Sequence, residues 1–140
     1  MATNMPEDVF KALCNLMTEY TYGVDAIADP ENVVDLFTDD VVIDFSDVAF
    51  PKMEGKDAVR AFYTGLTENM THEFHMPANF RAESWDGTVG AITAYVMGMG
   101  RAKDGTAISV KVRYRMECVE VDGAWKCRHF SLKNMMPLPA

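Results

Sequence analysis

Two residues that lie far apart in the sequence, His75 and Asp25, have side chains suited to acid–base chemistry. His75 lies in a stretch, 71–83, with the composition of a β-strand, and imidazole titrates near neutral pH. A buried Asp that accepts a hydrogen bond from one imidazole nitrogen fixes the tautomer of the ring. The other nitrogen is then free to take a proton from a substrate and to return it to a leaving group. The two residue types therefore predict a catalytic pair, provided that the fold brings them together.

The alternation of side chains along 71–83 predicts which residues share a face with His75. Successive side chains of a strand point to opposite faces, so Glu73, Asn79 and Arg81 are expected beside His75. Asn79 both donates and accepts hydrogen bonds and is predicted to contact a substrate. The other face is expected to hold the apolar residues Phe74, Met76, Ala78, Phe80 and Ala82. The alternative is a half-exposed strand whose polar face is solvated.

The element expected before this strand puts Asp25 at the end of a long helix. Pro6 followed by two acidic residues is typical of a helix start. Apolar residues at helical spacing then carry the helix to about Ala28: Val9, Leu13, Leu16, Tyr20, Val24 and Ile27. Asp25 falls in the last turn, where the helix dipole disfavours a carboxylate. This favours a functional role for Asp25, and a solvated Asp at a frayed helix end is the alternative.

The remaining elements follow from turn and helix-start patterns. A short helix is expected to start at 29–31 and to run through Phe37. A β-branched strand is expected at 41–45, and a third helix after Gly55. The loop at 46–55 either lids a pocket or covers the core. Asp-Gly turns then divide the rest into four antiparallel strands, one of which has three glycines suited to bends. The predicted fold class is α+β: a cone-shaped α+β barrel with three N-terminal helices packed on a strongly bent, mainly antiparallel sheet around a pocket.

Composition restricts the kinds of protein to consider. The 140 residues are 49% hydrophobic and are expected to form a single domain, 1–140. A net charge of −8 argues against nucleic acid and anionic membranes as partners. No long apolar run or secretory signal is seen, so a cytoplasmic location is expected. Cys14, Cys118 and Cys127 lack metal-site spacing and are expected to be reduced and buried. Neither a metal nor a cofactor is predicted.

Several short motifs resemble the nuclear transport factor 2-like superfamily. They are Tyr-Gly-Val-Asp at 22–25, Leu-Phe-Thr-Asp-Asp-Val-Val-Ile-Asp at 36–44, Gly-Lys at 55–56 and Asp-Gly-Ala-Trp-Lys at 122–126. Within it the chain, over roughly residues 7–135, is most similar to the SnoaL-like group that includes scytalone dehydratase and hexachlorocyclohexane dehydrochlorinase. The resemblance implies that Asp25 pairs with His75, with Asn79 in a His-x-x-x-Asn pattern. It also implies a homo-oligomer, dimer or trimer, formed through the convex face of the sheet.

The sequence departs from these enzymes at positions that would bind substrate. Tyr20 stands where the dehydrochlorinase has a lysine, and Phe130 falls near the position of its arginine. His129 is a candidate for the second pocket histidine of scytalone dehydratase. The substrate of neither enzyme is therefore carried over to this chain.

The predicted function is that of a cofactor-independent lyase, of the dehydratase or elimination type, or of an isomerase. Its substrate would be a small, largely apolar, aromatic or polycyclic molecule. Donors to developing negative charge would come from Tyr20, Tyr22, Tyr63, Tyr95, Tyr114, Asn79 and His129, although each tyrosine can equally be a core residue. The alternatives are a retro-aldol lyase or polyketide-type cyclase with the same pair, and a non-catalytic domain that binds a hydrophobic ligand or a protein.

The apolar tail at 134–140 contains two prolines and cannot continue a sheet. It is predicted to be ordered over a cavity mouth or a neighbouring subunit, and a frayed end is the alternative.

Overall fold

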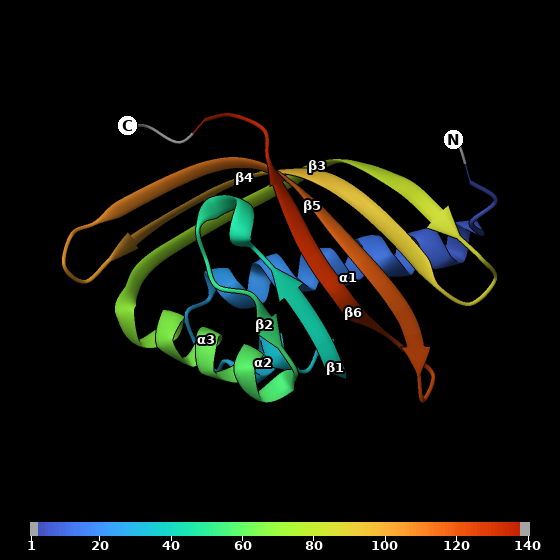
Figure 1. The fold of residues 1–140 in the computed structure, drawn as a ribbon, viewed down its shortest axis with the longest axis horizontal. Coiled ribbons are helices and arrows are strands. Elements are labelled where there is room, and N and C mark those ends of the chain that lie inside the picture. Colours follow the sequence, from blue (N-terminus) through green and yellow to red (C-terminus); the bar gives the residue numbers. More distant parts are fainter. Residues whose placement is uncertain (1–2, 138–140) are drawn as a thin grey trace.

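The computed structural model describes residues 3–137, which form three helices packed on one six-stranded sheet (Figure 1). In chain order the elements are α1 (Glu7–Asp25), α2 (Glu31–Val34), β1 (Phe37–Asp44), a 3₁₀ turn (Ser46–Val48), β2 (Met53–Glu54), α3 (Lys56–Asn69), β3 (Met70–Trp85), β4 (Gly90–Ala102), β5 (Ala107–Val121) and β6 (Ala124–Asn134). The strand order is β2-β1-β6-β5-β4-β3, with only β1 and β6 parallel. The predicted α+β cone is confirmed, and its sheet stays open at both edges.

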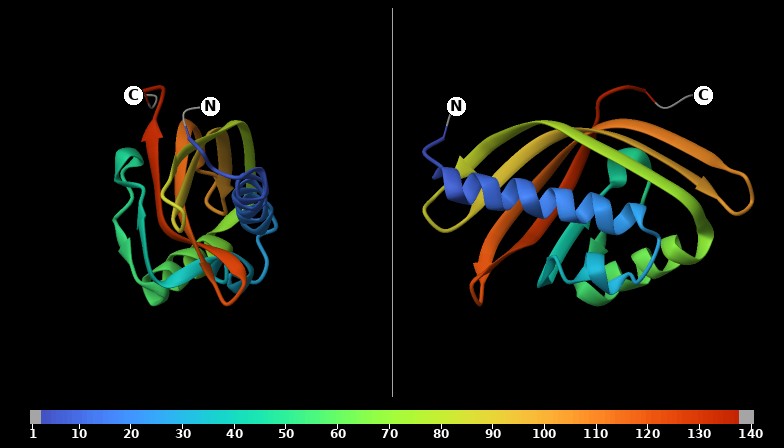
Figure 2. Two further views of the ribbon diagram at one scale, coloured as in Figure 1. Left: turned by 90° about the vertical axis from the view of Figure 1, so that its right-hand side faces the viewer. Right: turned by 180° about the vertical axis from the view of Figure 1, so that it is seen from behind.

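The sheet has an inner face toward the helices and an outer face away from them. The long strands β3, β4 and β5 curve over α1 (Figure 2). α3 lies on the same, inner side of the sheet, below α1 in the right-hand view. Leu13, Met17 and Tyr20 of α1 are buried against this face. Aromatic rings fill the centre, where Phe130 contacts the rings of Tyr20, Phe37, Phe45 and Tyr114. Each buried large apolar side chain contributes roughly 1.5–3 kcal/mol to folding. None of the helices within 3–137 is both long and apolar enough for a membrane crossing.

The end of α1 differs from the prediction by one turn. The helix stops at Asp25 and not at Ala28, because Ile27 adopts a left-handed conformation with φ of 47°. Gly23 lies where α2 approaches: a Cβ there would be 2.9 Å from Cγ2 of Val33. The absence of a side chain at Gly23 therefore lets α2 turn back tightly, and Asp25 becomes the last residue of the helix.

Two of the irregularities in strand pairing, one in β3 and one in β6, decide which predicted site residues face inward. In β3 the pairing moves from Ala78–Tyr95 to Arg81–Thr93, and Asn79 takes the left-handed conformation, with φ of 56°. One extra residue in the strand reverses the alternation. Phe80 and Ala82 therefore turn toward the core, while Phe74 and Met76 are exposed on the outer face. The prediction that these four residues share a face is wrong, and so is the placement of Asn79 and Arg81 beside His75.

The second bulge lies in β6. Glu117 of β5 pairs with His129, but the adjacent Cys118 pairs with Cys127, so Arg128 is the extra residue. Cys127 and Phe130 are consequently both buried, and His129 lies on the outer-face side, next to Glu117 and away from the core. The expectation that His129 lines a pocket is wrong for this reason.

The tail leaves β6 on the outer face. The backbone N–H of Met135 donates to the carbonyl of Lys111, at 2.9 Å. Met135 and Met136 line a hollow of about 520 Å³ together with Met76 and Met97. The described part of the tail therefore does not cover the cavity that contains His75, and residues 138–140 of the predicted segment lie outside the described residues.

Candidate active site

A cavity of about 100 Å³ lies between the inner face of the sheet and the helices. Its walls come from every layer of the fold: α1, α3, the loop after β1, and the four strands β3 to β6. Most of the lining is apolar, and the polar groups are few: Tyr20, Tyr63, Glu73, His75 and Tyr114. A mostly apolar cavity with a few converging polar groups is typical of a small-molecule site. Val48 and Phe50 belong to its wall, so the loop at 46–55 covers the cavity.

His75, in the wall of this cavity, is in direct contact with Asp25. Nδ1 of His75 lies 2.7 Å from Oδ1 of Asp25, and the backbone N–H of His75 donates to Oδ2 at 3.0 Å. The side chain of His75 is 12% exposed and that of Asp25 is 27% exposed. Because Asp25 accepts a hydrogen bond from Nδ1, the neutral imidazole carries its proton on Nδ1. Nε2 is then unprotonated and can accept a proton. The predicted proximity of the two residues is confirmed.

The contact depends on the position of β3 at the edge of the sheet. β4 pairs with only one side of this strand, so alternate backbone groups have no strand partner on the other side. The end of α1 packs along that side, and Asp25 accepts the free N–H of His75. The two hydrogen bonds offset the unfavourable position of a carboxylate at a helix C-terminus. Asp25 thus joins α1 to the sheet edge as well as orienting the imidazole.

Gly98 of β4 makes room for the imidazole. It pairs with His75 across the strands. A Cβ on Gly98 would lie 3.2 Å from Cδ2 and 3.4 Å from Nε2 of His75, and 3.1 Å from Cγ2 of Val110. The sequence predicted that the glycines of β4 bend the sheet. Gly98 also lets the imidazole ring of His75 lie close to the backbone of β4.

Glu73 is a further candidate site residue, for which the sequence predicted a place on the same face as His75 but no role. Its carboxylate lies 4.0 Å from Nδ1 of His75, and its side chain is only 8% exposed. Burial, followed by the negative charge of Asp25, raises the pKa of Glu73 to about 7. The available signal was its position two residues before His75, on the same face of the strand.

Three predicted tyrosines line the cavity. The hydroxyls of Tyr20 and Tyr63 hydrogen-bond to each other at 2.6 Å. Tyr114 lies across the cavity on β5. Burial is the largest cause that raises the pKa of all three well above the usual value, so they remain donors at neutral pH.

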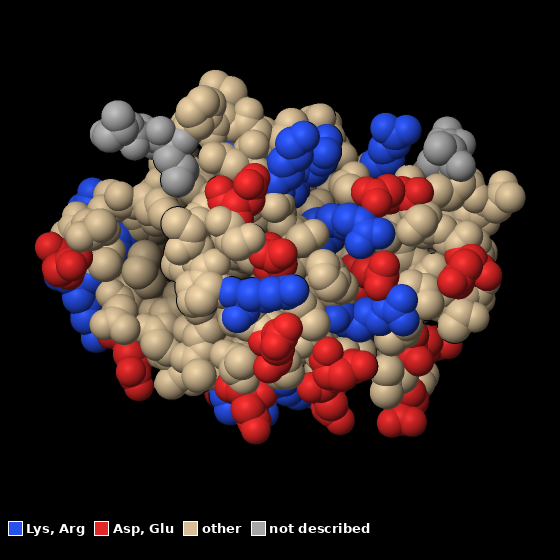
Figure 3. Space-filling model, in the orientation of Figure 1, with Lys and Arg blue, Asp and Glu red and all other residues tan. Residues whose placement is uncertain are grey.

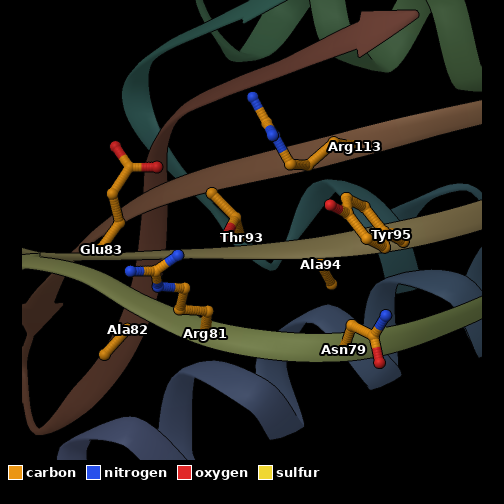
Figure 4. A pocket seen from close by; sticks show the side chains of 8 residues that line it. All are labelled: Asn79, Arg81, Ala82, Glu83, Thr93, Ala94, Tyr95 and Arg113. Atoms are coloured by element: carbon orange, nitrogen blue, oxygen red, sulfur yellow. The ribbon is translucent and has the colours of Figure 1, made fainter. Parts of the chain in front are cut away.

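Four other predicted site residues lie elsewhere. Tyr22 is 71% exposed on α1. Asn79 and Tyr95 line a separate hollow of about 450 Å³ on the outer face, together with the arginines of β3 and β5 (Figure 4). His129 does not line the cavity, as described above. The structure therefore brings together His75, Asp25, Tyr20, Tyr63 and Tyr114, and separates Asn79, Tyr22, Tyr95 and His129 from them.

The described residues offer two other candidate chemistries, metal binding and a cysteine nucleophile. Donor atoms of Asp25, Glu73 and His75 lie within 4.8 Å of one another, but Nδ1 of His75 is engaged by Asp25 while the pair is intact. The three cysteines are free, and two of them are buried. Burial raises the pKa of Cys14 to about 11 and that of Cys127 well above its usual value, so neither is a ready nucleophile.

The sequence matches the SnoaL-like domain family over residues 10–131, and the chain belongs to this family. This confirms the resemblance inferred from the sequence. A protein from Novosphingobium aromaticivorans DSM, with a proposed identity as an aromatic ring hydroxylase, has a TM-score of 0.94 and 34% identity, over 97% of this chain and 95% of that chain. No match is found among curated proteins.

Two more distant structures share the fold. A proposed scytalone dehydratase from Novosphingobium aromaticivorans DSM 12444 has a TM-score of 0.82 and 22% identity, over 92% of this chain and 85% of that chain. A type 2 hexachlorocyclohexane dehydrochlorinase has a TM-score of 0.79 and 17% identity, over 96% of this chain and 94% of that chain.

Proposed function

We propose that the protein is a cofactor-independent lyase of the dehydratase or elimination type, or an isomerase, in which His75 is the general base and Asp25 orients it. The observation that carries this proposal is the 2.7 Å contact between Nδ1 of His75 and Asp25, in the wall of a mostly apolar cavity. Neighbours described as a dehydratase and a dehydrochlorinase support the reaction class. The apolar lining supports an aromatic or cyclic substrate. So does the relative with a proposed identity as an aromatic ring hydroxylase, since that description names an aromatic substrate.

The reaction begins when Nε2 of His75 takes a proton from a carbon next to an electron-withdrawing group. Asp25 stabilises the imidazolium that forms and keeps Nε2 directed at the substrate. A positioned base of this kind supplies about 10²–10⁴-fold in rate. The negative charge that develops on a substrate oxygen needs hydrogen-bond donors. The hydroxyl of Tyr114 is suited to this task, and so is whichever of the Tyr20 and Tyr63 hydroxyls does not donate to the other.

Exchange of carbon-bound protons tests the base directly. The α protons of cyclohexanone are to be followed by NMR in heavy water, since a base that removes them introduces deuterium. We expect exchange by the wild type and a loss of about 10²–10⁴-fold in His75→Ala. Asp25→Asn should lose nearly as much, because its amide NH₂ faces Nδ1 and imposes the wrong tautomer. One amide oxygen remains to accept the backbone N–H, so the fold should persist.

His72→Ala is the matched control, because His72 is exposed and lies on the same strand. Its exchange rate should equal that of the wild type. The proposal is wrong if His75→Ala exchanges as fast as the wild type, or if the wild type does not exceed buffer.

A second probe separates elimination from retro-aldol cleavage, which can use the same two residues. 3-Hydroxycyclohexanone loses water to give cyclohexenone, whereas retro-aldol cleavage gives an open-chain keto-aldehyde. Cyclohexenone is the expected product. Binding of either ketone without any turnover would instead favour the non-catalytic alternative.

A further inference from the structure

We propose that Glu73 is the general acid of this site, the group that gives a proton to the leaving oxygen while His75 takes a proton from carbon. The inference rests on the proposed function and adds a second proton-transferring residue to it.

Glu73 and His75 are placed alike by the strand pair β3–β4. Both side chains point inward, two residues apart, and both line the cavity. His75 pairs with Gly98, and Glu73 pairs with Gly100. A Cβ on Gly100 would lie 3.0 Å from Oε1 of Glu73, so the carboxyl group occupies the space that a side chain at 100 would take. The proposed acid, Glu73, and the proposed base, His75, therefore each pack against a glycine of β4 in the wall of one cavity.

The carboxyl group of Glu73 has no hydrogen-bond donor from residues 3–137. Its nearest basic neighbour is Nδ1 of His75, at 4.0 Å, which is already bound to Asp25. An ionised carboxylate only accepts hydrogen bonds, so it would be buried here without a partner. A protonated carboxyl has an O–H that can point at a ligand. The surroundings thus favour the form that a general acid must have before the reaction.

The charges around Glu73 favour the same form. Asp25 and Tyr20 face it from α1, Tyr63 from α3, His75 from β3 and Tyr114 from β5. Among the described residues that line the cavity there is no Lys or Arg. His72 and Arg101 adjoin Glu73 and Gly100 in the strands, but both are exposed. Within residues 3–137, the charge that bears on the pKa of Glu73 is that of Asp25, which adds to burial in raising this pKa to about 7.

The protons balance in a dehydration. His75 removes the proton next to the carbonyl, the electron pair of the C–H bond forms the C=C bond, and the C–O bond breaks. Glu73 protonates the departing oxygen, so water leaves and not hydroxide. The released water then carries a proton from Nε2 of His75 to the Glu73 carboxylate. The site returns to its starting state without an oxidant or any co-reactant.

Glu73→Gln keeps the size and hydrogen-bonding ability of the side chain but cannot transfer a proton. We expect it to slow the dehydration of 3-hydroxycyclohexanone by about 10²–10⁴-fold, while exchange of the cyclohexanone α protons changes little. The matched control is Glu120→Gln, at an exposed position on β5, which should behave as the wild type in both assays.

The outcomes separate this inference from the proposed function. Dehydration by Glu73→Gln at the wild-type rate, or an equal loss in both assays, overturns the acid role and leaves His75 as the base. If His75→Ala keeps both proton exchange and dehydration at the wild-type rate, the proposed function itself is wrong.

A measurement without substrate tests the required protonation state. In protein labelled with ¹³C at glutamate carboxyls, the signal that disappears in Glu73→Gln should titrate near pH 7. A midpoint below about 5, close to that of an ordinary glutamate, contradicts the inference whatever the substrate is.

Discussion

At the scale of single residues, the site combines two carboxyl groups in different environments. Asp25 accepts two hydrogen bonds from His75, whereas Glu73 lies beside them with none from the described residues. Two titratable groups whose surroundings differ in this way are suited to different roles in proton transfer. Asp25 holds the imidazole through both hydrogen bonds, and Glu73 has a pKa raised to about 7, which suits proton transfer near neutral pH.

The raised pKa of Glu73 makes stability depend on pH. Its folded pKa of about 7 lies above the unfolded value of 4.5, so between these values the folded state holds a proton that the unfolded state has lost. Stability from this group therefore decreases as pH rises from about 4.5 to 7. We expect the free energy of unfolding of Glu73→Gln to exceed that of the wild type at pH 8 by on the order of 1–3 kcal/mol, with a correspondingly higher unfolding temperature. This difference should shrink at pH 5.

Thermal unfolding of both proteins at the two pH values measures this difference. Glu120→Gln again provides the control, since its exposed carboxylate should give no such dependence. A gap that is the same at pH 5 and pH 8 would show that Glu73 titrates normally.

At the scale of elements, the strand pair β3–β4 prepares the site. β3 carries the proposed base and the proposed acid on one face, and β4 supplies glycines opposite them. The free side of β3 receives the end of α1 and hence Asp25. A few residues further on, the bulge at Asn79 reverses the strand and directs Arg81 outward. Both residues proposed to transfer protons thus lie in the segment of β3 before the bulge.

Gly98→Ala should damage the site without replacing a titratable group. Its Cβ would meet Cδ2 of His75 at 3.2 Å and Cγ2 of Val110 at 3.1 Å, and both lie on strands that can shift little. Because the ring must move away, we expect cyclohexanone exchange to fall by about tenfold or more. Overpacking should also destabilise the fold by about 1–3 kcal/mol.

The matched control is Gly65→Ala in α3, where a Cβ would have nothing within 4 Å. Alanine there should stabilise the helix by up to about 1 kcal/mol and leave exchange unchanged. Wild-type exchange in Gly98→Ala would mean that the close approach to His75 has no consequence for its chemistry.

At the scale of the whole molecule, the outer face of the sheet is divided between charge and apolar surface. Acidic and basic side chains alternate over the middle of the face in Figure 3. On the sheet, Arg115 bridges Glu83 and Glu117, and Glu117 also pairs with Arg128. Further along β3 and β4 lies an outer apolar patch of residues that are each 37–56% exposed: Phe74, Met76, Tyr95, Met97, Met99 and Met136.

We expect this outer apolar patch to be an interface in a homo-oligomer, a dimer or a trimer. Contiguous exposed apolar area of this kind is uncommon on monomers and is typical of interaction surfaces. Sedimentation velocity at about micromolar protein should show an oligomer for the wild type. Met76→Glu combined with Met97→Glu should shift it toward monomer, because Met76 and Met97 are cross-strand neighbours in the patch.

Val121→Glu is the control, since Val121 is 41% exposed but lies next to the β5–β6 turn, away from the patch. It should leave the oligomeric state unchanged. A wild type that sediments as a monomer would refute the expectation.

The sequence by itself determined the order of the elements and the local positions of Asp25 and His75. Helical spacing and turn residues are local signals, and they placed Asp25 in the last turn of a helix and His75 on a strand. Both inferences needed only a few neighbouring residues. The family resemblance added that the two elements would meet.

Only the tertiary structure decided which of the other polar residues join the pair. The bulges at Asn79 and Arg128 arise from strand pairing in a curved sheet, and each reversed an alternation that looked regular in the sequence. The pKa of Glu73 likewise depends on burial and on the charge of Asp25, both set by segments distant in the chain. Desolvation and register depend on the elements that pack around a residue, and so local patterns could not predict either.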